Sequence, residues 1–247
     1  MIFIKEISGF IVSVVPYKES SKIVNIFTSE GVIGCIARGA KSLKSNLRVN
    51  TTKFTYGKFL IDFKKNNSLN VLREASSIND LQNIKSDLLK ISYLSYIVEL
   101  TNQAIKQTSD YESLYKLFIS TIMKLESKFD PKIITNIYEL KVLDYLGVGI
   151  NFNCCAKCGN TKNIVTIDGD IGGYVCSNCY TNEFIYDDKT IKMLRLYYLI
   201  DVSTISELKI SDKVINNINK FIEVYYDRYT GLYLKSKKFL KEIKDVY

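Results

Sequence analysis

Histidine is absent from the 247 residues of the chain. This absence excludes Ser-His-Asp and Cys-His catalysis, metal sites with imidazole ligands, and an imidazole general base at neutral pH. Long apolar runs are absent too: one of the longest, Phe10 to Pro16, is interrupted by Ser13 and falls well short of the ~20 residues that a membrane span needs. Lys5 and Glu6 interrupt the first apolar residues, so we expect no secretory signal and a cytoplasmic protein without a membrane role.

The composition favours a folded protein that works by binding. Apolar residues make up 47% of the chain, which is ordinary for a globular protein with a real core, and the length allows one large domain or two modest ones. Closely paired carboxylates that could hold a catalytic Mg²⁺ are few: Asp168 with Asp170, and Asp187 with Asp188. Both pairs fall at expected turns or helix caps, where Asp is ordinary, so we predict no enzymatic activity.

Acidic residues are missing from one long stretch, because none lies between Glu30 and Asp62. The first 80 residues carry 12 Lys+Arg and only 6 Asp+Glu, so most of the net charge of +8 belongs to them. Cations without neighbouring acids favour a polyanion, nucleic acid first and an acidic membrane surface second, although a solvated face of a lysine-rich protein has the same pattern. The candidate nucleic-acid-binding residues are the cations of this stretch: Arg38, Lys41, Lys44, Arg48, Lys53 and Lys58.

Four of the six cysteines form two C-x-x-C pairs. Cys155 and Cys158 make the first pair, and Cys176 and Cys179, after 17 intervening residues, make the second. Each turn can point two thiolates at one ion, so the spacing predicts a closed, structural Zn²⁺ site with four cysteine ligands. Two disulfides and a redox dithiol are the alternatives, but the chain shows no export signal and no βαβ unit around either pair. Cys154 could replace Cys155 in a longer spacing, and we interpret it as a spare thiol.

Residues 1–75 have the pattern of a β domain, with segments rich in Val, Ile, Phe and Tyr between turn-prone pieces. The expected strands are Ile7–Val15, Ile23–Thr28, Val32–Ala37, Thr55–Phe63 and Leu69–Arg73, and the expected turns are Pro16–Ser21, Ser29–Gly31, Lys41–Asn50 and Asn66–Ser68. This arrangement predicts a small closed barrel of the OB type, which periodicity does not distinguish from an SH3-like barrel. The aromatic candidates for base stacking are Tyr17, Phe54, Tyr56 and Phe59, for which a place in the barrel core is at least as well supported.

From Asn79 onwards the apolar residues recur with the period of a helix. The expected helices are Asp80–Lys106, Ser109–Leu125, Asp130–Gly147, Asp188–Val202, Ser211–Tyr229 and Leu232–Val246. The cysteine pairs fall inside this helical part, at about residues 151–182. We therefore predict an α+β multidomain fold: an OB-fold nucleic-acid-binding domain at 1–78, and an all-α domain at 79–247 with an inserted four-cysteine zinc finger.

Several short motifs accompany this order of parts. They are Tyr17-Lys18-Glu19, Ala37-Arg38-Gly39-Ala40-Lys41, Phe54-Thr55-Tyr56-Gly57, Cys155-x-x-Cys158-Gly159, Gly172-Gly173-x-x-Cys176-x-x-Cys179 and Gly231-Leu232 with Leu234-Lys235-Ser236. The motifs and the order of barrel, helical domain and inserted finger resemble the RecO family of bacterial recombination mediators. The resemblance covers nearly the whole chain.

The resemblance implies a non-enzymatic role in homologous-recombination DNA repair. RecO-like proteins bind single- and double-stranded DNA, anneal complementary strands, bind the acidic C-terminal tail of SSB, and act with RecR to load RecA onto coated strands. The lysines of the last expected helix could form a basic rim for that tail or a solvated face: Lys235, Lys237, Lys238, Lys241 and Lys244. An RNA-binding or translation-associated protein is the alternative function, since OB barrels and zinc knuckles serve RNA equally well. We expect a nucleoid-associated location.

Overall fold

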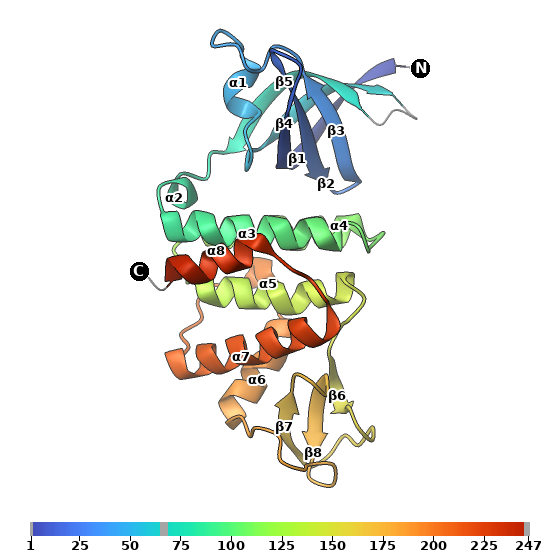
Figure 1. Ribbon diagram of the computed structural model, residues 1–247, viewed down its shortest axis with the longest axis vertical. Coiled ribbons are helices and arrows are strands. Elements are labelled where there is room, and N and C mark those ends of the chain that lie inside the picture. Colours follow the sequence, from blue (N-terminus) through green and yellow to red (C-terminus); the bar gives the residue numbers. More distant parts are fainter. Residues whose placement is uncertain (1, 65–68, 245–247) are drawn as a thin grey trace. The chain divides into compact units, whose positions relative to one another are not determined.

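The computed structural model describes residues 2–64 and 69–244. The expected turn at Asn66–Ser68 and residues 245–246 at the end of the expected last helix lie outside the described residues. Contacts between residues divide the chain into two compact units (Figure 1). Unit 1 comprises Met1–Lys85 and Asp110–Lys116, and unit 2 comprises Ser86–Ser109 and Leu117–Tyr247.

Five strands of unit 1 form a closed barrel in the order β1-β2-β3-β5-β4, in which β4 pairs back onto β1. The strands are β1 (Ile2–Tyr17), β2 (Ser21–Thr28), β3 (Gly31–Ala37), β4 (Tyr56–Lys64) and β5 (Asn70–Asn79). The neighbours pair antiparallel except β3 and β5, which are parallel. This topology confirms the expected β domain and agrees with a five-stranded OB-type barrel.

The first strand is longer than the sequence predicts because it serves two partners. β1 pairs with β4 along its first half and with β2 along its second half, and Phe10 takes part in both pairings. Gly9 lies where the strand changes partner, and a Cβ added there would stand 2.5 Å from the side chain of Ile26. A bulge between Ile11 and Ser13 adds to the bend. Alternating side chains of the strands, with Ala40 from the turn after β3, fill the barrel with a buried core: Ile7, Ile11, Val24, Ile26, Cys35, Ala37, Ala40, Phe59, Ile61 and Leu72.

The helices begin with α1 (Leu47–Asn50), which lies inside the expected turn between the third and fourth strands. The others are α2 (Gln82–Lys85), α3 (Leu88–Ala104), α4 (Tyr111–Glu126), α5 (Pro131–Tyr145), α6 (Asp188–Leu199), α7 (Asp212–Tyr229) and α8 (Lys235–Lys244), with a 3-10 turn at Val202–Thr204. The single helix expected at Asp80–Lys106 is wrong. Asp87 has extended backbone angles, and its side chain caps α3 by accepting hydrogen bonds from the N–H groups of Leu89 and Lys90.

A three-stranded sheet is inserted between α5 and α6 in unit 2. Its strands are β6 (Asn151–Cys155), β7 (Ile164–Asp168) and β8 (Gly173–Cys176), in the order β6-β8-β7. Aromatic side chains fasten this finger to the helices: the rings of Phe152 and Tyr198 are 5.1 Å apart, and the Tyr229 hydroxyl donates to the backbone oxygen of Asp170 at 2.8 Å. Gly169 fits against α7 because a Cβ there would lie 2.9 Å from Val224.

Within the described part of the chain, no helix combines the length and the apolar character needed to cross a bilayer.

The most enclosed helix is α5, where ten side chains are buried. Three of these are polar, namely Thr135, Asn136 and Glu139.

Candidate metal centre and basic surface

The two C-x-x-C segments form matching backbone turns. The Gly159 N–H donates to the Cys155 carbonyl at 2.8 Å, and the Tyr180 N–H donates to the Cys176 carbonyl at 2.9 Å. Gly159 has a φ of +75°, which glycine adopts without steric cost. The sheet brings the turns together, because β6 and β8, which end in the first cysteine of each pair, are direct neighbours.

The sulfur atoms of Cys155, Cys158, Cys176 and Cys179 all lie within 4.8 Å of one another. The Sγ atoms of Cys158 and Cys176 are 3.6 Å apart. Four sulfurs at ~2.3 Å from a central tetrahedral ion would be about 3.8 Å apart, so this cluster has the size of a metal site. The four cysteines could hold a metal ion, and soft thiolates suit a soft or borderline metal.

The protein environment favours one ionised sulfur in the cluster. Burial raises the pKa of the Cys155 thiol, but hydrogen bonds from backbone N–H groups, including that of Cys176 at 3.4 Å, lower it overall to about 6. The pKa of Cys179 is raised to about 12, because its thiol hydrogen-bonds Cys158 and is partly desolvated. Binding of a metal by all four sulfurs would therefore release protons and depend on pH.

An ion pair ties the two cysteine turns to each other. Lys157 is a residue of the first turn. Its ammonium donates to the Cys179 carbonyl at 3.1 Å and to Glu183 Oε1 at 2.5 Å. The other oxygen of Glu183 accepts from the Thr181 N–H at 2.8 Å. The hydrogen bond from Lys157, helped by that from Thr181, lowers the pKa of Glu183 to about 2. The charged pair fixes the geometry of the second turn around its cysteines.

Cys154 lies outside the cluster. Its Sγ accepts a hydrogen bond from the Asn151 amide at 3.4 Å, and it is not among the four sulfurs that lie together. This placement agrees with our interpretation of Cys154 as a spare thiol.

The cations of the acid-free stretch lie on the barrel unit. Arg38, Lys44, Arg48 and Lys53 are exposed, in the connection between β3 and β4 that contains α1. Lys41 is half-buried and donates to the Lys18 carbonyl at 2.8 Å. Lys58 differs from the others: it is exposed on β4 and forms an ion pair with Glu6 at 3.5 Å, which offsets its charge.

Lys22 also belongs to this group of cations on the barrel unit, although it was not predicted from the sequence. The pairing of β2 with β3 sets Lys22 opposite Ala37, the neighbour of Arg38. Burial lowers the pKa of Lys22, and the positive charges of Arg48 and Lys41 lower it further. The mutual repulsion shows that these three cations gather at one place. Lys22 and Arg48 are 26 positions apart in the chain, so only the three-dimensional structure reveals that they are neighbours.

The four aromatic candidates for stacking have different surroundings. Phe59 is fully buried and Phe54 is 9% exposed, so both belong to the barrel core. Tyr56 is half-buried and its hydroxyl hydrogen-bonds Tyr115. Tyr17 is half-buried with the Lys18 ammonium 5.5 Å from its ring. Two aliphatic side chains are far more exposed, Leu43 at 81% and Val49 at 74%, and both lie among the cations.

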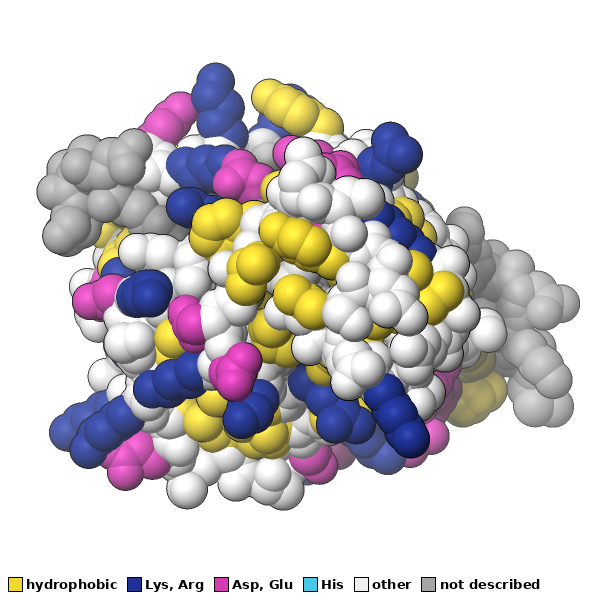
Figure 2. Space-filling view, turned by 90° about the horizontal axis from the view of Figure 1, so that it is seen from below, with side chains coloured by type: hydrophobic (Ala, Val, Ile, Leu, Met, Phe, Trp, Pro, Cys, Tyr) yellow, Lys and Arg dark blue, Asp and Glu magenta, His cyan; other side chains and the backbone are white. Residues whose placement is uncertain are grey.

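Cations also occur on another face of the molecule, where acidic side chains lie among them (Figure 2). Figure 2 shows Lys and Arg side chains interspersed with Asp and Glu around a group of exposed hydrophobic side chains. Ion pairs of unit 2 agree with this picture, such as Lys209 with Glu207 at 2.9 Å and Lys213 with Asp187 at 3.8 Å. Among the described residues, the cations of the acid-free stretch other than Lys58 form no ion pair with an acid, and this distinguishes the stretch more than its number of cations does.

Two family models match this chain. The model described as recombination protein O N terminal matches residues 1–81, and the one described as recombination protein O C terminal matches residues 85–238. A DNA repair protein RecO of Listeria monocytogenes is 33% identical over 239 residues, which is 95% of this chain and 93% of that protein. The RecO proteins of Halalkalibacterium halodurans and Bacillus velezensis are 32% and 29% identical, each over 242 residues, 96% of this chain and 94% of the relative. The resemblance found in the motifs is thereby confirmed, and the chain belongs to the RecO family of DNA repair and recombination proteins.

Proposed function

We propose that this chain is a recombination mediator that binds and anneals single-stranded DNA and, with RecR, helps load RecA onto SSB-coated strands. Residues 1–78 would act as the nucleic-acid-binding domain, and residues 79–247 as a helical domain with the finger at about 151–182. Annealing requires that phosphate repulsion be screened while base edges stay free, so this function needs no catalytic group. We place the protein at the nucleoid, where it would also meet double-stranded DNA.

The gathering of Lys22, Lys41 and Arg48 is the observation that carries this proposal. Burial lowers the pKa of Lys22 most, and the charges of Arg48 and Lys41 lower it further, so these cations produce a local positive field that attracts phosphates. The exposed Leu43 and Val49 add apolar surface beside the cations, on which unstacked bases can rest. Arg38 and Lys44 extend the basic surface along the same connection.

For the four-cysteine cluster we propose a structural Zn²⁺. Four thiolates at tetrahedral spacing suit zinc, and four protein ligands leave no open position for water or substrate. The metal would hold the finger's two turns together and so support the ends of α5 and α6, between which the finger is inserted.

For the acidic tail of SSB, α8 of unit 2 is the proposed contact. Lys235 and Lys238 are exposed, while Lys237 and Lys241 form ion pairs with Glu139 and Glu223. The side chain of Lys244 lies outside the described residues. The tail would therefore meet mainly Lys235 and Lys238.

Replacing Arg38, Lys41, Lys44 and Arg48 together with alanine tests the DNA-binding proposal. We expect weaker binding of single-stranded DNA and a slope of log K against log salt that is less steep by ~3, because each lost phosphate contact removes ~0.7 from the slope. A matched control replaces four exposed cations of unit 2: Lys106, Lys128, Lys189 and Lys209. Unchanged affinity and slope in the first variant, or equal loss in both, would contradict the proposal.

The RNA-binding alternative is tested in the same assay. Single-stranded RNA of matched sequence competes with labelled DNA, and a mediator of recombination should prefer the DNA. A clear preference for RNA would assign the barrel to the alternative function.

A further inference from the structure

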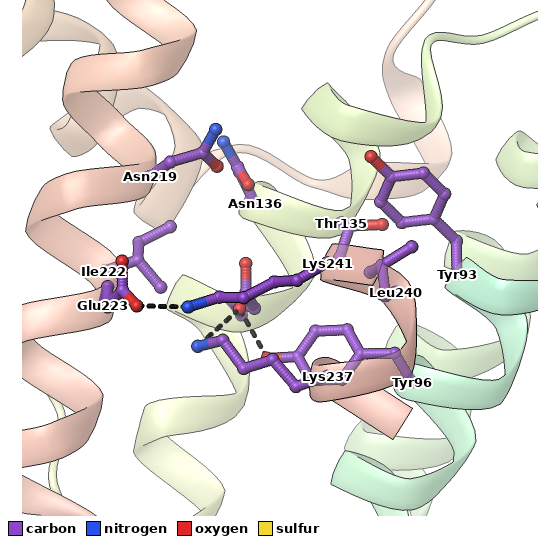
Figure 3. Close-up of a pocket in the computed structure, with 11 residues that line it drawn as sticks. Tyr93, Tyr96, Thr135, Asn136, Asn219, Ile222, Glu223, Lys237, Leu240 and Lys241 are labelled. Atoms are coloured by element: carbon purple, nitrogen blue, oxygen red, sulfur yellow. Dashed lines mark hydrogen bonds and ion pairs between the residues drawn. The ribbon is translucent and has the colours of Figure 1, made fainter. Parts of the chain in front are cut away.

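A small cavity of about 190 Å³ lies among α3, α5, α7 and α8, wholly within unit 2 (Figure 3). Tyr96 of α3, Asn136 of α5, Asn219 and Ile222 of α7, and Leu240 of α8 contribute to its lining. Figure 3 shows the amide groups of Asn136 and Asn219 pointing toward each other from neighbouring helices. The cavity therefore combines hydrogen-bonding groups with an apolar and aromatic wall.

Two polar groups of this lining are buried and have no hydrogen-bond partner. Asn136 and Thr135 are each only 3% exposed, and neither the Asn136 Nδ2 nor the Thr135 Oγ1 makes a hydrogen bond. Other helical hydroxyls of unit 2 bond the carbonyl four residues earlier, as Thr101 and Thr121 do at 2.6 and 2.8 Å. Buried polar groups in folded proteins are nearly always paired, so an unpaired amide donor facing a cavity indicates a missing acceptor.

The charges of the cavity are balanced within the protein. Lys237 forms an ion pair with Glu139 at 3.7 Å, and Lys241 pairs with Glu223. Glu139 also accepts a hydrogen bond from the Tyr96 hydroxyl at 2.5 Å. Because each ammonium already has its carboxylate, an anionic ligand would have to displace one of these partners. The lining favours an uncharged ligand with both acceptors and donors.

The size of the cavity selects a ligand of one ring. An apolar cavity of ~150 Å³ holds a benzene molecule, so about 190 Å³ holds a single six-membered ring with its substituents, but is tight for a fused two-ring base. A pyrimidine base has this size, is uncharged, and carries ring carbonyl oxygens that accept hydrogen bonds. Asparagine amides are established partners of base edges.

We propose that the cavity receives one unstacked pyrimidine base of a single-stranded nucleic acid, with Asn136 Nδ2 donating to a ring carbonyl of the base. This inference rests on the proposed function, in which the chain binds single-stranded DNA. Thr135 and Asn219 complete the edge contacts, and Ile222 and Leu240 cover the apolar part of the ring. Lys220 on α7 and Lys238 on α8 are exposed and adjacent in the chain to the lining residues Asn219 and Lys237, so they are available to the flanking phosphates.

The test compares Asn136→Leu with a matched change at Asn216, which is exposed on α7 and does not line the cavity. The probes are oligo(dT), oligo(dA) and an abasic strand, each of about 15 nucleotides, a length within the range of single-strand binding sites. We expect N136L to lower the affinity for oligo(dT) by about five- to ten-fold, the effect of one hydrogen bond, and to leave oligo(dA) and the abasic strand unchanged. N216L should bind all three strands as the unchanged protein does.

The melting temperature separates binding from folding. N136L replaces an unpaired buried donor by an apolar group of similar size, so its melting temperature should be equal or higher. A strand with one 5-iodo-deoxyuridine should photo-crosslink to the α3 peptide that contains Tyr93 and Tyr96, and N136L should abolish that crosslink. Unchanged oligo(dT) affinity in N136L, or a crosslink only to unit 1, would overturn the inference.

Two further outcomes distinguish the possible failures. If the unchanged protein binds none of the strands, the proposed function itself fails, and the inference with it. If it binds them but N136L weakens only the binding of a synthetic acidic peptide, the cavity is a peptide site, and only the inference is overturned.

Discussion

Cys154 and Cys155 are adjacent in the sequence but differ in their surroundings. Cys155 is buried among the other three sulfurs, while Cys154 is half-exposed and accepts a hydrogen bond from the Asn151 amide. We therefore expect Cys154→Ser to keep one bound metal per chain and an unchanged melting temperature. Cys176→Ser should lose the metal and unfold the finger, because the site then lacks a buried ligand and metal binding supplies the folding energy of such small modules.

Metal content by atomic emission and thermal melting with and without a chelator check this prediction. Cys35→Ser is unsuitable as a control, since Cys35 is fully buried in the barrel core. If C154S released the metal while Cys155→Ser retained it, the longer C-x-x-x-C spacing would be the correct one.

At the level of single residues, the sequence was sufficient where chemistry depends on local spacing. The four cysteines were found from two C-x-x-C pairs, because a turn of that length fixes the geometry of its own two sulfurs. Lys22 and Asn136 were not found, since their roles depend on neighbours distant in the chain. Lys22 of β2 and Arg48 of α1 are brought together only by the fold of unit 1, and Asn136 looks like any polar residue of a helix until its burial is known.

Helix α8 is attached to the rest of unit 2 through a carboxylate of another helix. Glu99 of α3 accepts hydrogen bonds from the N–H of Ser236 at 2.8 Å and from that of Lys235 at 3.3 Å, so it caps the start of α8. We expect Glu99→Ala to weaken the docking of α8 by about 1–2 kcal/mol, the usual cost of losing an N-terminal cap. Because α8 supplies Leu240 to the cavity lining, the affinity for oligo(dT) should fall as well.

Hydrogen exchange measures this effect directly. Amides of α8 should exchange about five- to thirty-fold faster in E99A, which corresponds to that loss of free energy, while amides of α5 change little. Glu242→Ala is the matched control, since Glu242 is exposed on α8 itself. Equal exchange in the two variants would show that the cap contributes nothing.

Elements were predictable as far as their own side chains decide them. Strands β2, β3 and β4 and helices α4, α5 and α7 follow the hydrophobic period, and their observed bounds lie close to the expected ones, whereas β1 and β5 extend beyond theirs. The hydrophobic period continues through Asp87, however, although the side chain of Asp87 caps a new helix. The prediction from the sequence therefore combined α2 and α3 into one helix. The first residues of β1 were missed because Lys5 and Glu6 break the apolar pattern, although both pair with β4.

On the scale of the whole molecule, the start of α4 makes its contacts with a different unit from the one that precedes it in the sequence. Asp110–Lys116 groups with the barrel residues, although it follows α3 in the sequence. The ring of Tyr115 meets Phe27 edge-on at 5.4 Å, and its hydroxyl bonds Tyr56. The ring of Tyr111 lies 3.3 Å from where a Cβ on Gly31 would be. A domain boundary placed at residue 78 from the hydrophobic period alone would separate Asp110–Lys116 from the barrel that this segment contacts.

Tyr115→Ala should therefore destabilise the barrel selectively. The loss of a half-buried ring and of its edge-on contact should cost about 2 kcal/mol, a value below the 3–5 kcal/mol typical of fully buried aromatic residues. Amides of β2 and β3 should exchange about thirty-fold faster, and those of α5 and α7 should keep their protection, because the two units have separate cores. Tyr115→Phe retains the ring and loses only the hydrogen bond to Tyr56, so it should cost about 1 kcal/mol. If α5 and α7 lost protection equally with β2 and β3, unfolding would be a single cooperative event, and the barrel would have no stability separate from the helices that carry the finger.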